Sequence, residues 1–381
     1  MGRRPAASPA GRAGLWRHGD AGVEAVRAAG RQRPARGPLP AAGRETGVTT
    51  LADPGTDCGR IFATGRWQDA WLAGGMEATA AHVRLRAGDV PVTLQLVTDS
   101  PLWRGYEGDA ELPPVWEGPV AYLSTVYAVA NPLNQVPDAS GTVARALEIA
   151  GEWDAKALVV TNLEPGPALE SLPRPDALVR LDATCRLRLA DGMDGYLDGL
   201  ATSHRGRLRR YHRRGAQAGL TYHDRDRTEA GHVLPAFARL TRQSAERHGT
   251  PPLYSEAALR ALLEVPGTRL LSADLDGRPA AGLLSFEWDG CLVLWAAGID
   301  YALLKTHFPY YFLIYEAIAA AAERGCRWVD FGRGNLEFKQ RLGFHPVDLW
   351  SPVYLLARRP AYAGRLAEMH RRISDFLGRP G

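Results

Sequence analysis

The sequence predicts a mixed α/β (α+β) fold of two units in tandem, each with a mixed, mostly antiparallel central sheet flanked by helices. The length of 381 residues corresponds to about two domains. From residue 58 onward, strand-like and helical segments alternate along the chain. Hydrophobic residues make up 45% of the chain and charged residues 23%, which excludes a wholly disordered, collagenous or coiled-coil protein.

The first unit is expected over residues 56–190, after an extension at 1–55. The extension is rich in Arg, Ala, Gly and Pro, so it cannot bury enough apolar surface to offset the entropy of ordering, and we expect it to be disordered. Within the unit, hydrophobic periodicity predicts both helices and strands. In chain order these are a helix at 65–72, a hairpin of strands at 82–86 and 90–99, a helix at 139–151, and strands at 155–162 and 177–189.

The second unit is expected over residues 191–358, followed by a C-terminal helix at 359–381. Three β-rich runs are joined by Asp276-Gly277 and Asp289-Gly290, and such pairs favour two-residue hairpin turns. In chain order the predicted segments are helices at 193–219 and 229–249, strands at 268–275, 279–288 and 291–299, a helix at 309–324, a strand at 327–332, a short helix at 335–343 and a strand at 346–356.

Cysteine and histidine spacing bears on the compartment and on metal binding. The four cysteines lie far apart without a C-x-x-C pair, which predicts neither a disulfide framework nor a zinc site. The histidines are equally scattered, and no apolar run reaches the ~18 residues of a membrane-spanning helix. We therefore expect a protein of the reducing cytoplasm that spans no membrane, binds no metal and holds no permanent cofactor.

The densest run of charge lies in the helix predicted at 193–219. Six arginines and two histidines occur between Ser203 and Tyr222, and no acidic residue accompanies them. At about 100° per residue the arginines point round most of the helix, which favours a phosphate-contacting surface; a solvated basic helix is the alternative. The candidate phosphate- or tRNA-binding residues are Arg205, Arg207, Arg209 and Arg213.

A second charged cluster lies where the strand at 327–332 meets the next helix. Gly332 and Gly334 permit close backbone approach to a ligand, and Asn335 is a favoured N-cap residue. A structural turn explains these three residues but not the charged residues beside them, which are Asp330, Arg333, Glu337 and Lys339. Because ligands bind at strand ends in α/β sheets, this cluster is the candidate site.

Two segments resemble a known family. The segment 307–350, with its stretch DFGRGNLEFKQRLGF, resembles the C-terminal signature of the Fem-type, peptidoglycan-biosynthesis-like branch of the GNAT acyltransferase superfamily. The run SHRGRLRRYHRRGAQAGL (203–220) is similar to the basic helix of that branch. The first unit resembles the degenerate N-terminal GNAT half of the branch only in the order of its elements.

The resemblance implies direct transfer of an acyl group from a thioester or a tRNA ester to an amine or hydroxyl. Such a reaction needs a stabiliser of the developing oxyanion, a base, and groups that hold the phosphates of the donor. Lys339 is the expected charge stabiliser, Asp330 or Glu337 the base, and Arg333 the clamp on a phosphate or carboxylate. The remaining expected substrate-binding residues are Gly334, Asn335 and Tyr315.

The resemblance leaves the donor and the acceptor open. The stretch 299–311 contains no glycine, whereas coenzyme A users of the superfamily carry a glycine-containing loop there. The sequence therefore favours aminoacyl-tRNA over acetyl-CoA as the acyl donor. The expected acceptor is a small molecule or a muropeptide, in cell-wall or secondary metabolism. A non-catalytic GNAT-fold binding module and a nucleic-acid-binding protein are the other hypotheses, and the oligomeric state is not predicted.

Overall fold

The computed structural model describes residues 58–248, 252–357 and 359–378. In these ranges the strands are β1 (Ala78–Ala87), β2 (Val90–Asp99), β3 (Val120–Leu123), β4 (Ala157–Val160), β5 (Ala177–Arg188), β6 (Thr221–Arg225), β7 (Thr268–Leu275), β8 (Arg278–Trp288), β9 (Cys291–Ile299), β10 (Trp328–Arg333) and β11 (His345–Leu355). The α-helices are α1 (Gly65–Gly74), α2 (Pro101–Asp109), α3 (Ser140–Glu152), α4 (Pro167–Glu170), α5 (Gly192–Gly199), α6 (Thr202–Gln217), α7 (Arg227–Ala230), α8 (Leu234–His248), α9 (Glu256–Leu263), α10 (Pro309–Glu323), α11 (Leu336–Arg341) and α12 (Pro360–Leu377). Two 3-10 helices are η2 (Arg60–Ala63) and η3 (Pro132–Gln135). The predicted disordered extension at 1–55 lies outside the described residues.

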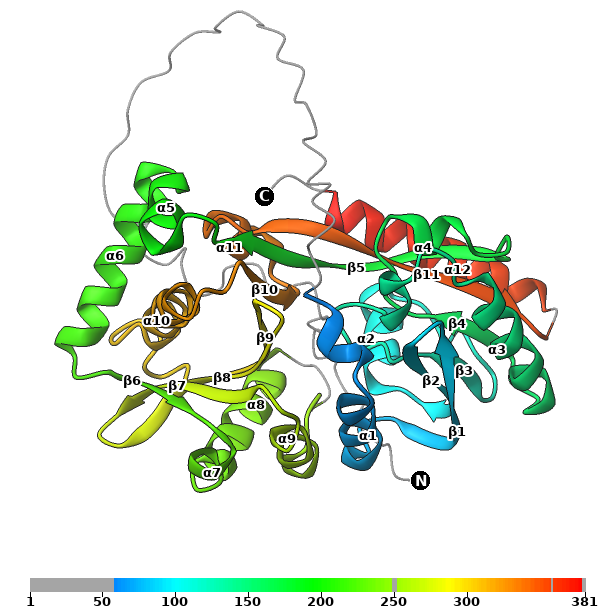
Figure 1. Cartoon of the computed structure of the whole chain (residues 1–381), viewed down its shortest axis with the longest axis horizontal. Helices are drawn as coiled ribbons and strands as arrows, with labels where there is room; N and C mark the ends of the chain where they lie inside the picture. Colours follow the sequence, from blue (N-terminus) through cyan, green and yellow to red (C-terminus); the bar gives the residue numbers. More distant parts are fainter. Residues whose placement is uncertain (1–57, 249–251, 358, 379–381) are drawn as a thin grey trace, which may run out of the picture.

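The strands of the described part form one eleven-stranded sheet with helices on both faces (Figure 1). Their order is β1-β2-β3-β4-β11-β5-β10-β9-β8-β7-β6. Only the neighbours β3–β4 and β9–β10 run parallel, and the other pairs are antiparallel. The predicted class, a mixed α/β fold with a mostly antiparallel sheet, is confirmed.

The meander of the second half forms as its turns predict. Asp276 and Gly277 connect β7 to β8, and Asp289 and Gly290 connect β8 to β9. All four residues have φ between 47° and 74°, the left-handed conformation that a tight type I′ hairpin requires at both central positions. After β9, helix α10 crosses over the sheet and returns the chain parallel to β9 as β10.

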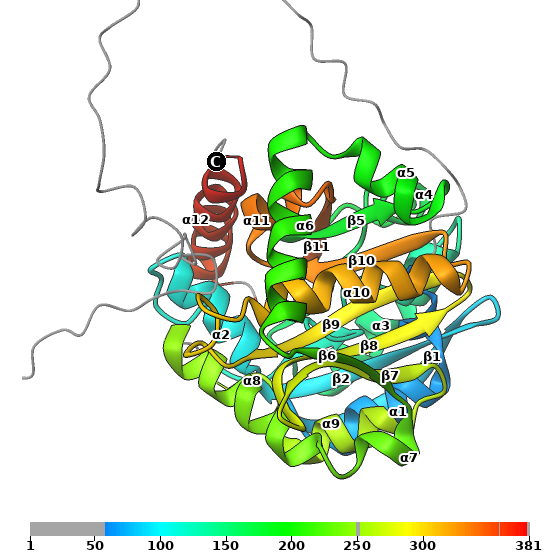
Figure 2. The same ribbon diagram turned by 90° about the vertical axis from the view of Figure 1, so that its left-hand side faces the viewer.

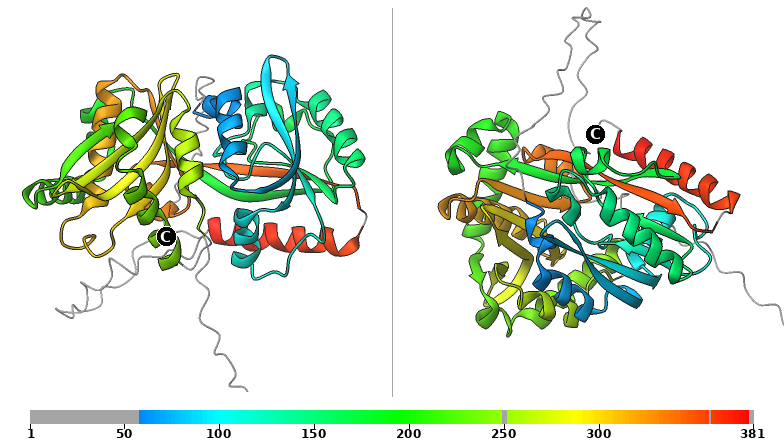
Figure 3. Two further views of the ribbon diagram at one scale, coloured as in Figure 1. Left: turned by 90° about the horizontal axis from the view of Figure 1, so that it is seen from below. Right: turned by 45° about the vertical axis from the view of Figure 1, so that its right-hand side comes forward.

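The last strand joins the two halves. β11 lies between β4 and β5 and pairs antiparallel with both, with Val353 opposite Val159 and His345 opposite Arg186. The sequence suggested two sheets, whereas the structure has one, because β11 from the second unit pairs with two strands of the first. In the left view of Figure 3, β5 and β11 run together across the middle of the molecule, and α12 lies below the first half.

Two of the predicted helices are broken, and several elements were not predicted. The segment 193–219 forms α5 and α6, because Leu200 is extended with ψ 143°. The segment 229–249 forms α7 and α8. Elements α2, β3 and β6 lie in stretches whose polar, proline or aromatic content obscures the periodicity, whereas α9 was not predicted although its leucines have helical spacing.

The prediction that the cysteines form no disulfide is wrong for one pair. Cys58 and Cys291 are joined by a disulfide with 5.3 Å between their Cα atoms, across a separation of 233 residues. Sequence spacing could not exclude this bond, because the entropic cost of closing a loop grows only slowly with its length. Cys185 and Cys326 are buried free thiols. The cysteines therefore no longer support a reducing compartment.

Buried aromatic residues from both halves pack between them. The ring of Trp71 lies 4.7 Å from that of Tyr127 and 6.1 Å from that of Trp295, and Tyr254 lies 4.6 Å from Trp295. The indole N–H of Trp295 also donates to the backbone carbonyl of Tyr127 at 3.2 Å. Since cores pack as densely as crystals, this cluster and the shared sheet hold the halves as one rigid frame.

Candidate active site

The parallel strands β9 and β10 separate soon after they meet. Their pairing extends only from Trp328 opposite Cys291 to Asp330 opposite Val293. β9 then continues to Ile299, with an irregularity in its pairing to β8 that leaves Trp295 without an opposite residue. Over the described length of both strands, the backbone groups of β9 and β10 beyond Asp330 are therefore not paired with one another. We call this region, together with the turn into α11, the strand exit.

The turn from β10 into α11 has an unusual backbone. Gly332, Gly334 and Asn335 have φ values of 65°, 74° and 47°, all in the left-handed region. A Cβ at Gly332 would make only an ordinary contact of 3.4 Å with the carbonyl oxygen of Leu294, so its left-handed backbone rather than crowding favours glycine there. Asn335 precedes α11 as predicted, but its side chain makes no capping hydrogen bond. Non-glycine residues held in this conformation are strained, and such strain concentrates at functional sites.

Asp330 is held by three donors. It is fully buried and accepts hydrogen bonds from Thr184 Oγ1 at 2.5 Å, Arg186 Nε at 2.9 Å and the backbone N–H of Gly332 at 2.8 Å. Arg186 also donates to both carboxylate oxygens of Glu164, at 2.7 and 2.6 Å. A carboxylate so engaged has no accessible lone pair directed at a substrate, so this geometry argues against Asp330 as the base and for a role in anchoring β10 to β5.

Lys339 lies inside the strand exit. Its side chain is 5% exposed, and its Nζ donates to the carbonyl oxygens of Gly332 at 3.0 Å and Arg333 at 2.7 Å. Nζ also lies 5.0 Å from the centre of the Phe331 ring. Burial lowers the pKa of Lys339, since desolvation disfavours the charged form. The lysine therefore fixes the shape of the exit and places a positive charge behind it.

Arg333 bonds to the first half of the protein. Its guanidinium donates to the hydroxyl of Tyr106 at 3.0 Å, to the carbonyl of Tyr127 at 3.0 Å and to the carbonyl of Val126. Tyr106 in turn donates to Asp182 at 3.2 Å, and burial raises the pKa of that carboxyl. Arg333 thus positions the loop of the first half against the strand exit. Sequence reasoning missed Tyr106 and Asp182, because neither lies near the motif in the chain.

Glu337 and Tyr315 are placed differently from the buried residues. Glu337 lies in the first turn of α11, 42% exposed, in an ion pair with Arg341. Tyr315 stacks on His212, with ring centres 3.9 Å apart, where α10 meets α6. The structure therefore brings Lys339, Arg333, Gly334 and Asn335 together at one strand exit, with Glu337 beside them. Tyr315 instead packs against α6.

Aromatic residues surround the strand exit on the α10 side. Tyr310 and Tyr311 in the first turn of α10 lie 5.8 and 5.5 Å from the ring of Phe338. Phe308, just before α10, has φ 55°, which is strained for a bulky residue. Side chains from the first turns of α10 and α11 are therefore in contact beside the exit of β10.

The basic helix α6 crosses α10 at a steep angle (Figure 2). Leu208 and Gly215 are its buried residues, and a Cβ at Gly215 would lie 3.0 Å from the Cβ of Phe312. The arginines occupy the remaining faces of the helix, which explains why they did not form a single stripe. The helix therefore presents a broad basic surface to solvent.

Within that surface, two arginines adjoin the start of α10. Arg214 lies 5.8 Å from the ring of Phe308, and Arg210 lies 5.2 Å from the ring of Tyr211, which itself stacks on Phe308 at 4.4 Å. The predicted Arg205 instead pairs with Asp198 at 2.7 Å. The predicted Arg207, Arg209 and Arg213 also lie on α6, and within the described part of the chain no ion pair or ring contact distinguishes them. The i, i+4 spacing of Arg210 and Arg214 around Tyr211 was the available sequence signal.

The first half contains a similar β-α-β unit whose exit is filled. Strands β3 and β4 are parallel and joined across α3. Beyond them, Asn131 donates to the carbonyls of Leu123 at 3.1 Å and Thr161 at 2.6 Å, and Asn162 donates to that of Ala128 at 2.7 Å. Buried side-chain amides thus satisfy these carbonyl groups, as Lys339 satisfies those of Gly332 and Arg333 in the second half. The second half is the candidate site because the charged turn into α11 and the gap in the β8–β9 pairing at Trp295 lie there.

No cluster of metal-ligating side chains occurs in the described ranges. In the same ranges, no helix combines the length and apolar character needed to cross a membrane.

The comparison with protein families concerns the second half. Residues 202–340 match the model of the acetyltransferase (GNAT) domain. This range runs from the start of α6 into α11, so it includes the strand exit and Lys339. No curated protein matches the chain.

Three solved structures share the fold over both halves. FemX has a TM-score of 0.55 at 14% identity, covering 80% of this chain and 96% of FemX. The C-terminal domain of a putative lysylphosphatidylglycerol synthetase from Agrobacterium fabrum has a TM-score of 0.53 at 11% identity, covering 83% and 96%. L-PGS from Bacillus licheniformis has a TM-score of 0.52 at 11% identity, covering 82% and 97%. At these identities the likeness establishes the fold.

Proposed function

We propose that this chain, an acyltransferase whose residues 202–340 belong to the GNAT acetyltransferase family, transfers an aminoacyl group from aminoacyl-tRNA to the amine or hydroxyl of a small-molecule or peptidoglycan-type acceptor. The observation that carries the proposal is that the pairing of β9 with β10 ends at Asp330, close to where Trp295 of β9 has no opposite residue on β8. Preorganised backbone N–H groups at such a point stabilise the oxyanion that develops on a reacting carbonyl.

The reaction balances without a cofactor. The acceptor nitrogen or oxygen attacks the ester carbonyl of the aminoacyl group, the bond from that carbon to the ribose oxygen breaks, and the ribose hydroxyl leaves as the proton of the acceptor passes through a base. Glu337, exposed at the start of α11, is the proposed base. Lys339 supplies positive potential and, with Arg333, holds the shape of the exit.

The charge on α6 supports a polyanionic donor. Arg210 and Arg214 lie beside the start of α10, and the rest of the arginine surface extends from them along the helix. Guanidinium groups bind phosphate oxygens in a bidentate manner, and several of them attract a nucleic acid backbone. The lysyl group in the name of one structural neighbour is likewise an aminoacyl group.

Acetyl-CoA is the second candidate donor, because the matching family model describes an acetyltransferase. One assay separates the two donors. Labelled aminoacyl-tRNA and labelled acetyl-CoA are each incubated with the protein and the low-molecular-mass fraction of the source cells as acceptor. We expect label to move to a small product only from aminoacyl-tRNA, and ribonuclease treatment of the donor to prevent the transfer. Turnover with acetyl-CoA alone, insensitive to ribonuclease, would replace the proposal by the second candidate.

A pair of lysine variants adds a control to this assay. Lys339→Met removes the charge at the strand exit and is expected to abolish transfer. Lys156→Met removes a partly exposed lysine of the first half that pairs with Asp154 at 3.1 Å, and it should leave transfer unchanged.

A further inference from the structure

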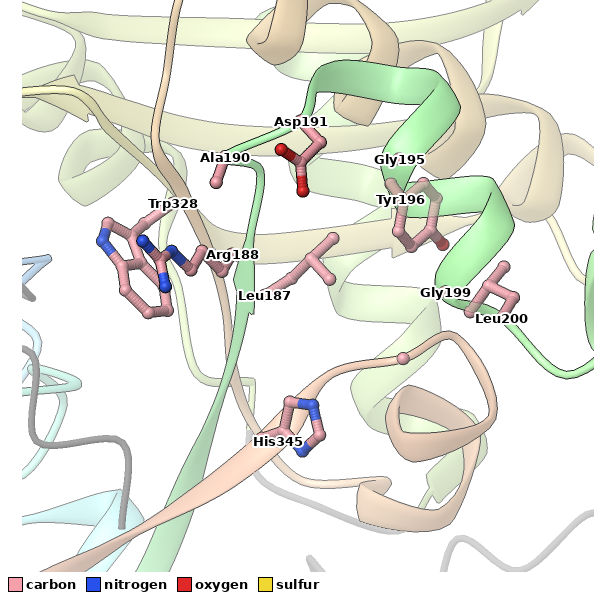
Figure 4. Close-up of a pocket in the computed structure, with 11 residues that line it drawn as sticks. Leu187, Arg188, Ala190, Asp191, Gly195, Tyr196, Gly199, Leu200, Trp328 and His345 are labelled. Atoms are coloured by element: carbon pink, nitrogen blue, oxygen red, sulfur yellow. The ribbon is translucent and has the colours of Figure 1, made fainter. Parts of the chain in front are cut away.

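A second site lies at the opposite end of β10 from the strand exit. A pocket of about 290 Å³ opens between α5, the end of β5 and the start of β11 (Figure 4). Trp328, the first residue of β10, forms one wall, whereas Arg333 is the last residue of that strand. At ~3.3 Å per residue the two ends are about 16 Å apart. The pocket therefore adjoins the start of β10, whereas the strand exit follows its end, and the pocket volume is near the lower limit of about 300 Å³ for ligand pockets.

One side of the pocket is apolar. Leu187, Tyr196 and Leu200 line it, and each of these residues is nearly fully buried. The hydroxyl of Tyr196 donates to the carbonyl of Leu342 at 3.1 Å, so this residue presents its ring rather than its hydroxyl to the pocket. This side fits a short aliphatic or aromatic group.

The other side carries charges of both signs. Asp191 occupies the N-cap position of α5, where Asp ordinarily accepts a hydrogen bond from the helix N–H groups, yet its side chain makes no capping bond. Its carboxylate instead points into the pocket, and the imidazole of His345 faces it from the opposite wall (Figure 4). Arg188, whose guanidinium carries five N–H donors, lines the pocket beside Trp328.

Contacts within the protein do not explain why residue 199 is a glycine. Gly199 is the last residue of α5. A Cβ at this position would meet no atom within 4 Å, so neighbouring protein atoms do not demand a glycine. Gly199 lines the pocket, and its missing side chain leaves room there.

From these features we propose that the pocket binds a small zwitterion with an apolar tail, of which an apolar α-amino acid is the simplest form. The ammonium group pairs with Asp191, the carboxylate with Arg188 and His345, and the tail packs on Leu187 and Leu200. A ligand that carries both an ammonium and a carboxylate group matches this lining best. A simple amine would place its positive charge near Arg188, and a simple acid would place its negative charge near Asp191.

Calorimetric titration of the full chain tests the proposal with three probes. L-leucine carries both charges, isoamylamine lacks the carboxylate, and isocaproate lacks the ammonium group. We expect leucine to bind at one site and each analogue to bind at least about tenfold more weakly, because each loses one charge-assisted contact. Absence of leucine binding, or an analogue that binds as tightly as leucine, would overturn the proposal.

Four variants locate the binding. Asp191→Asn is expected to weaken leucine binding about tenfold, whereas Asp194→Asn, the same change at an exposed position of the same helix, should not. Gly199→Leu fills the pocket without a backbone clash and should abolish binding. Lys339→Met should retain it. Equal losses in the two aspartate variants, retention in Gly199→Leu, or loss in Lys339→Met would each refute this location, and thermal unfolding verifies that every variant is folded.

Discussion

Asp330→Asn distinguishes a structural anchor from a catalytic base. The substitution keeps the size of the side chain but removes its charge, and an amide N–H2 on the side facing Arg186 would oppose the Nε donor of the arginine. Removing one partner of a buried ion pair costs about 3–5 kcal/mol. Because Arg186 keeps two hydrogen bonds to Glu164, we expect the lower end, a loss of about 3 kcal/mol in the free energy of unfolding.

The assay is urea unfolding followed by tryptophan fluorescence, with Asp289→Asn as the control. Asp289 pairs with Arg60 at 2.8 Å, but both side chains are nearly half exposed, so its loss should cost below about 1 kcal/mol. The pH dependence of transfer by the folded Asp330→Asn enzyme should be that of the parent. A variant with parental stability, transfer reduced more than about a hundredfold and a lost acidic limb of the pH–rate profile would show that Asp330 is the base and that the anchoring argument is wrong.

Four further outcomes follow from the contacts described above. Burial lowers the pKa of Lys339, so between that lowered pKa and about 10.4 the unfolded state binds more protons than the folded state. The free energy of unfolding of the parent should therefore rise with pH over this range. Urea unfolding at a series of pH values should show that Lys339→Met lacks this rise. Arg210→Ala with Arg214→Ala should weaken tRNA binding and reduce the slope of log affinity against log salt by about two, while Arg239→Ala on α8 should change neither in a filter-binding titration. Reduction of the disulfide between the halves should lower the unfolding free energy by about 2–5 kcal/mol, measured with and without reductant; an unchanged midpoint would contradict this. Deletion of residues 345–381 should leave β4 and β5 without their shared neighbour, so circular dichroism and gel filtration should show a misfolded chain rather than a folded second half.

Local patterns predicted the elements whose partners lie nearby in the chain. The Asp-Gly pairs predicted the meander because a two-residue turn determines the pairing of its flanking strands. Arg333, Gly334, Asn335 and Lys339 were predicted as one site because a strand end and the following helix turn necessarily bring them together. The split of 193–219 into two helices escaped prediction, since the extended backbone at Leu200 leaves no mark in the hydrophobic pattern.

The roles of the charged residues depended on partners that lie far away in the sequence. Asp330 looked like a base until the fold placed Arg186 and Thr184 against it, and Arg333 looked like a ligand clamp until Tyr106 and the loop at Tyr127 took up its donors.

The sequence by itself determined the fold class, the order of elements from β7 to β11 and the position of the strand exit, because periodicity and turn chemistry are local. Only the tertiary structure decided that β11 joins both halves in one sheet, that Cys58 and Cys291 meet, and that Arg210 and Arg214 adjoin α10. The physical reason is that a side chain's hydrogen bonds, burial and charge environment come from residues distant in the chain, and no local pattern specifies which residues those are.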